Sequence, residues 1–176
     1  MVKGAVQQWG LMETVTPKQL WKELTYTPSW LGPAVAANNF KPWERRVSVV
    51  ALLRAKNGCS AWFNTGTGSA ADVMSKVPIL NISPNGNPNI PGPDAQTSPN
   101  PTAPIEVFTN GRFWPIQYSA NGLPVGGVFQ PGSGGAQTII LLHELAHKTG
   151  LIPDDWASGS DQNTQTVMSH CAGTIQ

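Results

Sequence analysis

The chain has 176 residues, which is enough for one domain with a substantial core, and its formal net charge is +1. Only 12% of the residues are Asp, Glu, Lys or Arg, about half the usual share, whereas Gly and Pro are plentiful. A charge this close to zero excludes a strongly basic nucleic-acid-binding or membrane-surface protein, and no apolar run is long enough to span a bilayer.

This composition is typical of a secreted or cell-surface domain. We expect one monomeric domain over residues 1–176, without nucleic acid or membrane partners. No apolar signal-peptide core follows Met1. The export signal, if the protein has one, is therefore expected outside this chain.

The segment up to about Phe40 is rich in Trp and Pro. Thr16 as an N-cap and Pro17 at the first helical position predict a short helix that ends near Leu24. Exposed tryptophans can bind carbohydrate or a partner, but in a chain with so few charges we expect them to pack against the body of the domain.

The next segment alternates helix signals with stops. Residues 43–56 carry apolar side chains at 43, 47, 50 and 51, then at 53 or 54, which is the spacing of an amphipathic helix. The β-branched centre keeps a strand as the alternative. Asn57-Gly58 ends this element. A second helix is predicted over Ser69–Lys76, before Pro78.

Residues 83–104 contain seven prolines and a single charged residue, which predicts a long Pro/Asn-rich surface loop rather than an element. A loop of this length in a compact domain is usually functional or mobile. We expect it to wrap the surface and to border a cleft.

Residues 105–130 carry the strand signals. Ile105–Thr109 alternates in polarity, Asn110-Gly111 is a strong hairpin signal, and Arg112-Phe113-Trp114 resumes the strand. Asn121-Gly122 marks a second turn before residues 123–130. These signals predict a three-stranded antiparallel meander.

The sharpest functional signal is His143-Glu144-Leu145-Ala146-His147, which lies in a predicted helix over Ala136–Thr149 that is apolar almost all the way round. Side chains four positions apart share one helix face, so both imidazoles can bind one ion, and Zn²⁺ is the ion that they suit. Glu144 can then reach a water on the metal rather than the metal itself. The pattern predicts the parts of metal-assisted hydrolysis.

The third metal ligand stays open between two aspartates and a histidine. No glutamate follows Glu144, so the remaining candidates are Asp154 or Asp155, which can turn back to the ion after Gly150, and His170. His170 lies on a helix predicted over residues 161–171 and capped by Ser160 or Asp161. If His170 is not a ligand, it is a candidate catalytic donor to a developing oxyanion.

With its continuation to Gly150, the motif resembles the His-Glu-x-x-His-x-x-Gly helix of the zincin metallopeptidases, in particular metzincins and small bacterial zincins with an aspartate as third ligand. Those families place a ligand three residues after the glycine, where this chain has Pro153. More loosely, the C-terminal layout resembles zincin-like domains attached to secreted polymorphic toxins. The resemblance implies a peptide or protein substrate, and an edge strand beside the metal helix that pairs with it. Val125–Phe129 is the candidate strand.

The two cysteines are Cys59 and Cys171. Cys171 falls on the buried stripe of the predicted C-terminal helix, with Thr164, Val167 and Met168, and the composition is typical of oxidising compartments. We therefore expect a disulfide. Two buried free thiols, or thiolate metal ligation, remain as alternatives.

The sequence as a whole predicts an α+β fold: a small zincin-like domain whose buried helix packs on a small, mainly antiparallel sheet. The predicted activity is that of a zinc-dependent metalloendopeptidase with Glu144 as general base. The alternatives are a non-catalytic domain that zinc merely stabilises, and a secreted effector protease with one narrow target.

Overall fold

The computed structural model describes residues 33–82, 93–115 and 123–175. Backbone contacts divide the chain into two compact units, Met1–Ala37 and Asn38–Gln176, and the described strands all belong to the second. The helix expected near Thr16, the N-terminal tryptophans and the turn expected at Asn121 lie outside the described residues. The single domain expected over residues 1–176 stays a prediction for the segment before Asn38.

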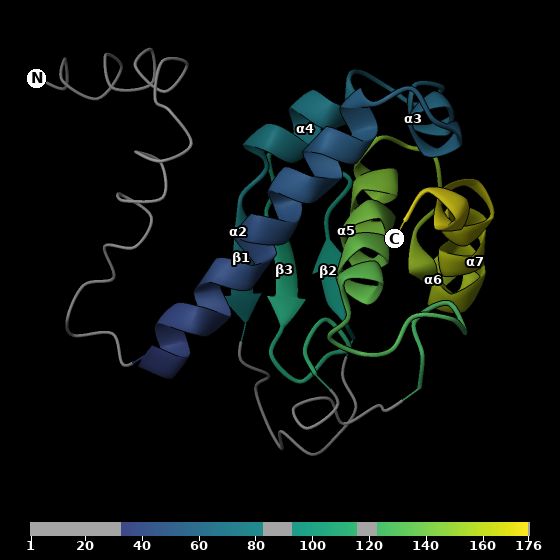
Figure 1. Cartoon of the computed structure of the whole chain (residues 1–176). Helices are drawn as coiled ribbons and strands as arrows, with labels where there is room; N and C mark the ends of the chain where they lie inside the picture. The colour runs from purple at the N-terminus through teal and green to yellow at the C-terminus, as the bar shows by residue number, and fades with distance from the viewer. Residues whose placement is uncertain (1–32, 83–92, 116–122, 176) are drawn as a thin grey trace, which may run out of the picture. The chain divides into compact units, whose positions relative to one another are not determined.

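The α+β class is confirmed (Figure 1). The elements in chain order are α2 (Pro33–Arg54), α3 (Gly58–Phe63), α4 (Ala70–Lys76), β1 (Ile79–Ile82), β2 (Ala95–Thr97), β3 (Ile105–Phe108), α5 (Gly134–Lys148), α6 (Asp155–Ser158), α7 (Ser160–Cys171) and the 3-10 turn η2 (Ala172–Thr174). Helix α5 packs against β2 on one side and α7 on the other. Among the described helices, none is both long and apolar enough to cross a membrane.

The sheet differs from the predicted one. Its strand order is β1-β3-β2, with β1 parallel and β2 antiparallel to β3, so it is mixed rather than mainly antiparallel. Both partners of β3 precede it in the chain, whereas the sequence predicted that residues 105–130 would pair among themselves. Turn signals fix where a chain reverses, but they do not fix which strand becomes the neighbour.

The predicted meander is wrong beyond Phe108. Phe113 and Trp114, which were expected to resume the strand, are buried in the core, and the Trp114 indole N–H donates to the Phe108 carbonyl at 3.0 Å. The candidate edge strand Val125–Phe129 forms only an isolated bridge between its two end residues. Large aromatic side chains gained more from burial here than from a position on a half-exposed strand.

The predicted long loop is partly wrong as well. Residues 83–92 lie outside the described part. Residues 93–104 contain β2, and polar contacts hold the chain both before and after this strand. Before β2, Asp94 forms an ion pair with Arg112 at 2.7 Å. Gly111 is required at this point, because a Cβ there would lie 2.7 Å from the Asp94 Cα. A three-residue strand is too short to give a periodic signal, so only its tertiary partners reveal it.

Helix α2 begins earlier than predicted, with Pro33 at its first position, where the missing N–H is not needed. It continues through Pro42. Leu53, at an expected position, is buried and Val50 packs partly against the core, but Pro42 and Val49 are buried too, whereas Val47 is 52% exposed. Apolar residues occupy most of the circumference of this helix, so its sequence alone did not select the buried face.

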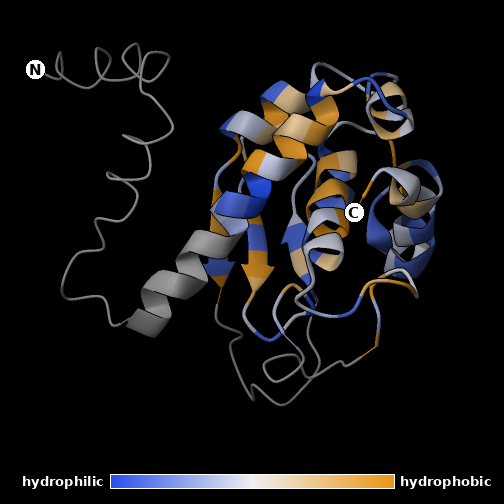
Figure 2. Cartoon of the chain, viewed as in Figure 1, coloured by the Kyte–Doolittle hydropathy of each residue, from blue (hydrophilic) through white to orange (hydrophobic). Residues whose placement is uncertain are grey.

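Helix α5 is the buried centre of the domain, as predicted, although it begins at Gly134 rather than Ala136. The Ser133 side chain caps its start by accepting from the Ala136 N–H. At its other end Gly150 (φ 70°) and Leu151 donate back to the carbonyls of His147 and Ala146, which is a Schellman motif. In Figure 2 α5 is largely hydrophobic, whereas α6 and α7 are mostly hydrophilic. The chain leaves α5 in a defined direction and returns beside it as α6 and α7.

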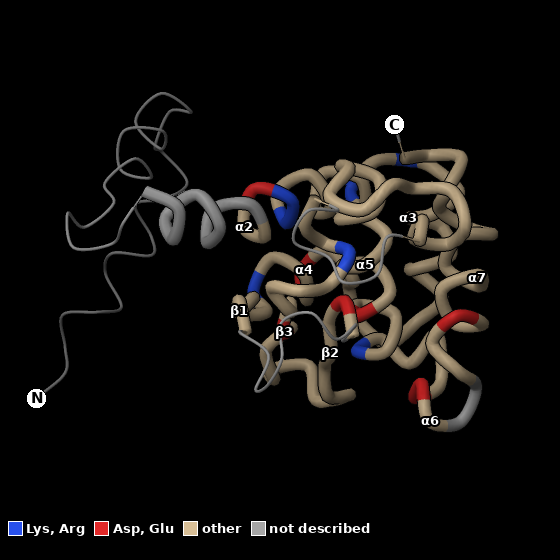
Figure 3. The backbone as a smooth tube through the Cα atoms, turned by 90° about the horizontal axis from the view of Figure 1, so that it is seen from below, with Lys and Arg blue, Asp and Glu red and all other residues tan. Residues whose placement is uncertain are grey.

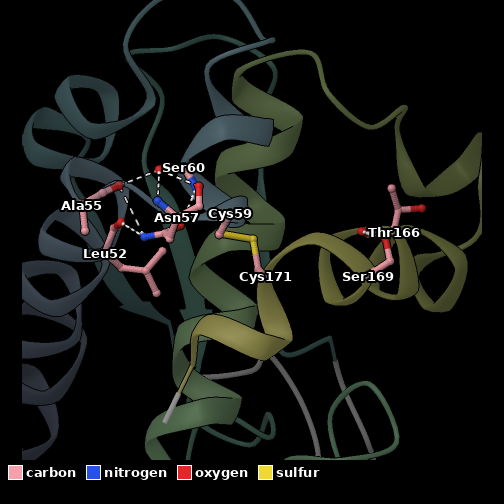
Figure 4. Close-up of a disulfide and its surroundings, with 8 residues drawn as sticks. All are labelled: Leu52, Ala55, Asn57, Cys59, Ser60, Thr166, Ser169 and Cys171. Carbon is pink, nitrogen blue, oxygen red and sulfur yellow. Dashed lines mark hydrogen bonds between the residues drawn. A yellow bond between two sulfur atoms is a disulfide. The ribbon is translucent and has the colours of Figure 1, made fainter.

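The disulfide between Cys59 and Cys171 is confirmed, and it joins α3 to the end of α7 (Figure 4). The predicted stripe of α7 is also confirmed, because Thr164, Val167 and Met168 are buried with Cys171. Its N-cap is Gly159 rather than Ser160 or Asp161. The disulfide therefore fixes the helix that packs against α5.

We predict that the double substitution Cys59→Ala with Cys171→Ala lowers the free energy of unfolding by about 2 to 5 kcal/mol, because the two cysteines are 112 residues apart and their link restricts the unfolded chain. Urea denaturation measures the effect, and the reduced wild-type protein is the matched control. Equal denaturation midpoints for the oxidised wild type and the variant would contradict the prediction.

Candidate metal centre

The two motif histidines face each other on α5. Their Nε2 atoms lie 3.0 Å apart, and the side chains of His143 and His147 are only 6% and 8% exposed. Burial lowers the pKa of His143, although the Asp155 carboxylate opposes that shift. The neutral imidazole, which is the form that binds metals, is thereby favoured.

Asp155, the first residue of α6, completes the group. Its Oδ1 lies 3.3 Å from the Nε2 of each histidine. The Asn163 amide on α7 donates to this same oxygen at 2.8 Å and to the Pro153 carbonyl at 2.8 Å, which holds the turn and the carboxylate together. Burial alone would raise the pKa of Asp155, but the Asn163 hydrogen bond and the two imidazoles outweigh it and lower that pKa.

The triangle formed by these three atoms has the dimensions of a metal site. In a tetrahedral zinc site with metal–ligand distances of about 2.05 Å, two ligand atoms are about 3.3 Å apart. The observed separations are 3.0, 3.3 and 3.3 Å. Within the described residues, His143, His147 and Asp155 form the single group of this kind, and they could hold a metal ion.

A hydrogen bond from α7 orients one of the ligands. The Thr164 hydroxyl lies 3.0 Å from the Nδ1 of His143. When Nε2 faces a metal, Nδ1 carries the hydrogen and donates to Thr164, which fixes both the tautomer and the ring orientation. The sequence placed Thr164 on the apolar stripe of α7 and did not single out Asn163. Neither residue carries a motif of its own, so only the packing of α7 on α5 shows what they do.

Glu144 is not one of the three ligands, but it lines the hollows beside them. It is 5% exposed, and burial, reinforced by the nearby Asp155 charge, raises its pKa to about 8. The Lys148 charge opposes this shift. A divalent cation on the adjacent ligands would favour the carboxylate form of Glu144 again. Glu144 is therefore a buried carboxyl group beside the three candidate ligands.

Two of the other predicted site residues lie elsewhere. Asp154 is exposed and is not part of the ligand group, although it lines the neighbouring cleft. The ring of His170 is stacked on Trp62, with ring centres 4.6 Å apart, next to the disulfide. Of the three candidates for the third ligand, Asp155 is the one that lies in one group with the two histidines.

A cleft of about 650 Å³ opens beside the ligands, and its lining includes Glu144, His147 and Asp155. Its opposite wall is β2 and the chain after it, including Ser98 and Pro104. A smaller hollow of about 180 Å³ lies against His143, Glu144 and Thr164. Asp155 lines both hollows, together with His147 in the cleft and His143 in the smaller hollow.

Lys148, which sequence reasoning did not identify, fixes the outer wall of the cleft. It is 4% exposed, and its ammonium group donates to the carbonyls of Ser98, Asn100 and Ala103 at 3.2, 3.0 and 2.7 Å. All three hydrogens of the ammonium group can be used in this way. Lys148 therefore holds α5 against the segment between β2 and β3.

Comparisons of the chain with models of protein families, with curated proteins and with solved structures found no match. The resemblance to zincins therefore rests on the motif itself.

We predict that Asp155→Ala weakens zinc binding by at least about 100-fold, because it removes a direct ligand. This loss should weaken binding more than the loss of a residue that only hydrogen-bonds to a ligand. Asp154→Ala, the matched control from the next position, should change the affinity less than about fivefold, since exposed charges interact weakly. Competition with a chromophoric chelator measures both constants. The reverse pattern would make Asp154 the third ligand.

Proposed function

We propose that this protein is a zinc-dependent metalloendopeptidase. The observation that carries the proposal is the arrangement of three metal-compatible ligand atoms, with 3.0 to 3.3 Å between them, beside a buried carboxyl group that is not one of them. Zinc sites with three protein ligands leave a fourth position for water and are typically catalytic, whereas purely structural sites are closed by four protein ligands.

Each residue then has a separate task. His143, His147 and Asp155 would hold Zn²⁺, which supplies a water of lowered pKa and polarises a carbonyl group when it is bound. Glu144 accepts the proton from the attacking water and delivers it to the leaving nitrogen. Thr164 and Asn163 keep His143 and Asp155 in position during these steps.

One feature of the structure supports a peptide substrate, beyond the resemblance of the motif to the zincins. Strand β2 is at one end of the strand order, and its three residues line the cleft beside Glu144. An extended peptide can pair with such an edge through its main chain. This role replaces the one expected for Val125–Phe129.

The disulfide favours an oxidising location, and we place the protein outside the cytosol.

We predict that Glu144→Gln keeps zinc at one ion per chain but lowers the rate of peptide hydrolysis by about 10²- to 10⁴-fold, because only the proton acceptor is removed. Zinc content and cleavage of an unfolded protein such as casein are measured on the same sample.

Glu44→Gln, on the exposed face of α2, is the control and should retain full activity. If Glu144→Gln cleaved as fast as the wild type, the mechanism would be wrong. A wild-type protein that binds zinc but cleaves nothing would instead indicate a domain that zinc only stabilises.

A further inference from the structure

The cleft has a charge pattern that the hydrolytic mechanism does not use. Four carboxylate residues line it: Glu106, Glu144, Asp154 and Asp155. No Lys or Arg is present among its described lining residues. Figure 3 shows acidic colour on α6, with no basic residue drawn there. The cleft is therefore a negatively charged surface.

A bound metal would leave two of these carboxyl groups without a balancing charge. A divalent cation offsets the charges of Asp155 and Glu144, which lie at the ligand group. Glu106 and Asp154 are left, and they are not part of that group. Glu106 accepts a hydrogen bond from the Gln96 amide at 2.6 Å, but that partner is neutral. Asp154 occupies the N-cap position of α6, but its side chain makes no capping hydrogen bond, so its carboxylate is not needed to hold the helix end.

Two described cations that adjoin this region, Lys148 and Arg112, are engaged in other contacts. The Lys148 ammonium is bound by three backbone carbonyls behind the cleft wall. Arg112 forms a two-pronged contact with Asp94, with Nη2 at 2.7 Å and Nε at 2.9 Å from Oδ2. It lines the smaller hollow, not the cleft. Neither side chain supplies the positive charge that would balance Glu106 and Asp154.

An exposed tryptophan stands next to these carboxylates. Trp156 follows the ligand Asp155 directly, lines the cleft and is 102% exposed, the highest exposure of any large hydrophobic side chain in the described residues. An exposed indole at the edge of a cleft offers a flat apolar face to a ligand. An aromatic face next to carboxylates is a setting that attracts cationic groups, since the ring face is negative and the carboxylates add Coulomb attraction.

We propose that the cleft selects peptide segments that carry a Lys or Arg side chain, with Trp156, Asp154 and Glu106 as the residues that determine this specificity. The inference rests on the proposed function for its peptide substrate, and it concerns binding rather than hydrolysis. The aliphatic stem of the bound side chain lies on the indole, and its charged end meets the carboxylates.

The test uses the zinc-loaded Glu144→Gln protein, so that bound peptides are not consumed. Three blocked peptides differ at a single position, which is lysine, norleucine or glutamate. Norleucine keeps the aliphatic stem of lysine without its charge. At low ionic strength the lysine peptide should bind about tenfold more tightly than the norleucine peptide, and the glutamate peptide should bind most weakly. The lysine preference should shrink in 0.5 M salt because of screening, with a Debye length of about 4 Å at that concentration.

Variants separate the contributions of the cleft residues. Asp154→Asn and Trp156→Leu should each reduce the preference for lysine over norleucine about three- to tenfold, whereas Trp156→Phe should keep most of it, because an aromatic face remains. Asp161→Asn removes a similar exposed charge that does not line the cleft and should leave the preference unchanged.

Equal affinities for the lysine and norleucine peptides, or no peptide binding at all, would overturn the inference. A lysine preference that survives both Asp154→Asn and Trp156→Leu would also overturn the assignment of these residues. A separate result bears on the proposed function. If the wild type binds the lysine peptide preferentially but cleaves none of the peptides, the peptidase proposal fails and the cleft preference stands.

Discussion

Two imidazoles and a carboxyl group are buried on one helix, and such groups are costly in an apolar core unless they find partners. The structure supplies those partners from the chain after α5. Asp155 approaches both Nε2 atoms, Thr164 contacts the remaining nitrogen of His143, and Asn163 holds Asp155. A positive ion between the three ligand atoms would satisfy all of them together, since two unprotonated nitrogens 3.0 Å apart direct lone pairs at each other.

Other parts of the fold hold α6 and α7 beside α5. The Schellman motif at Gly150 reverses the direction, and the disulfide fixes the far end of α7 to α3. On the other side of α5, hydrogen bonds from Lys148 hold the segment between β2 and β3 against this helix. The candidate metal site lies on α5 beside α6, and the cleft lies between it and the segment around β2.

The sequence could predict what depends on local pattern. The His-Glu-x-x-His helix, the α7 stripe and the disulfide follow from residue spacing and from burial on one helix, and all three are present. The sheet could not be predicted, because β2 has only three residues and β3 pairs with strands that precede it. The third ligand was narrowed to three residues, but the choice of Asp155 over Asp154 depends on the exact path after Gly150. Asn163, Thr164 and Lys148 are ordinary polar residues in the sequence, and their positions come from packing alone.

The proposed chemistry depends on a divalent ion held by two imidazoles and a carboxylate. X-ray absorption spectroscopy on the zinc-loaded protein tests this directly. The expected result is one zinc per chain with two imidazole nitrogens and one or two oxygens at about 2.0 to 2.2 Å, and no sulfur. A protein that retains no zinc, or a zinc shell without imidazole, would contradict the proposed site.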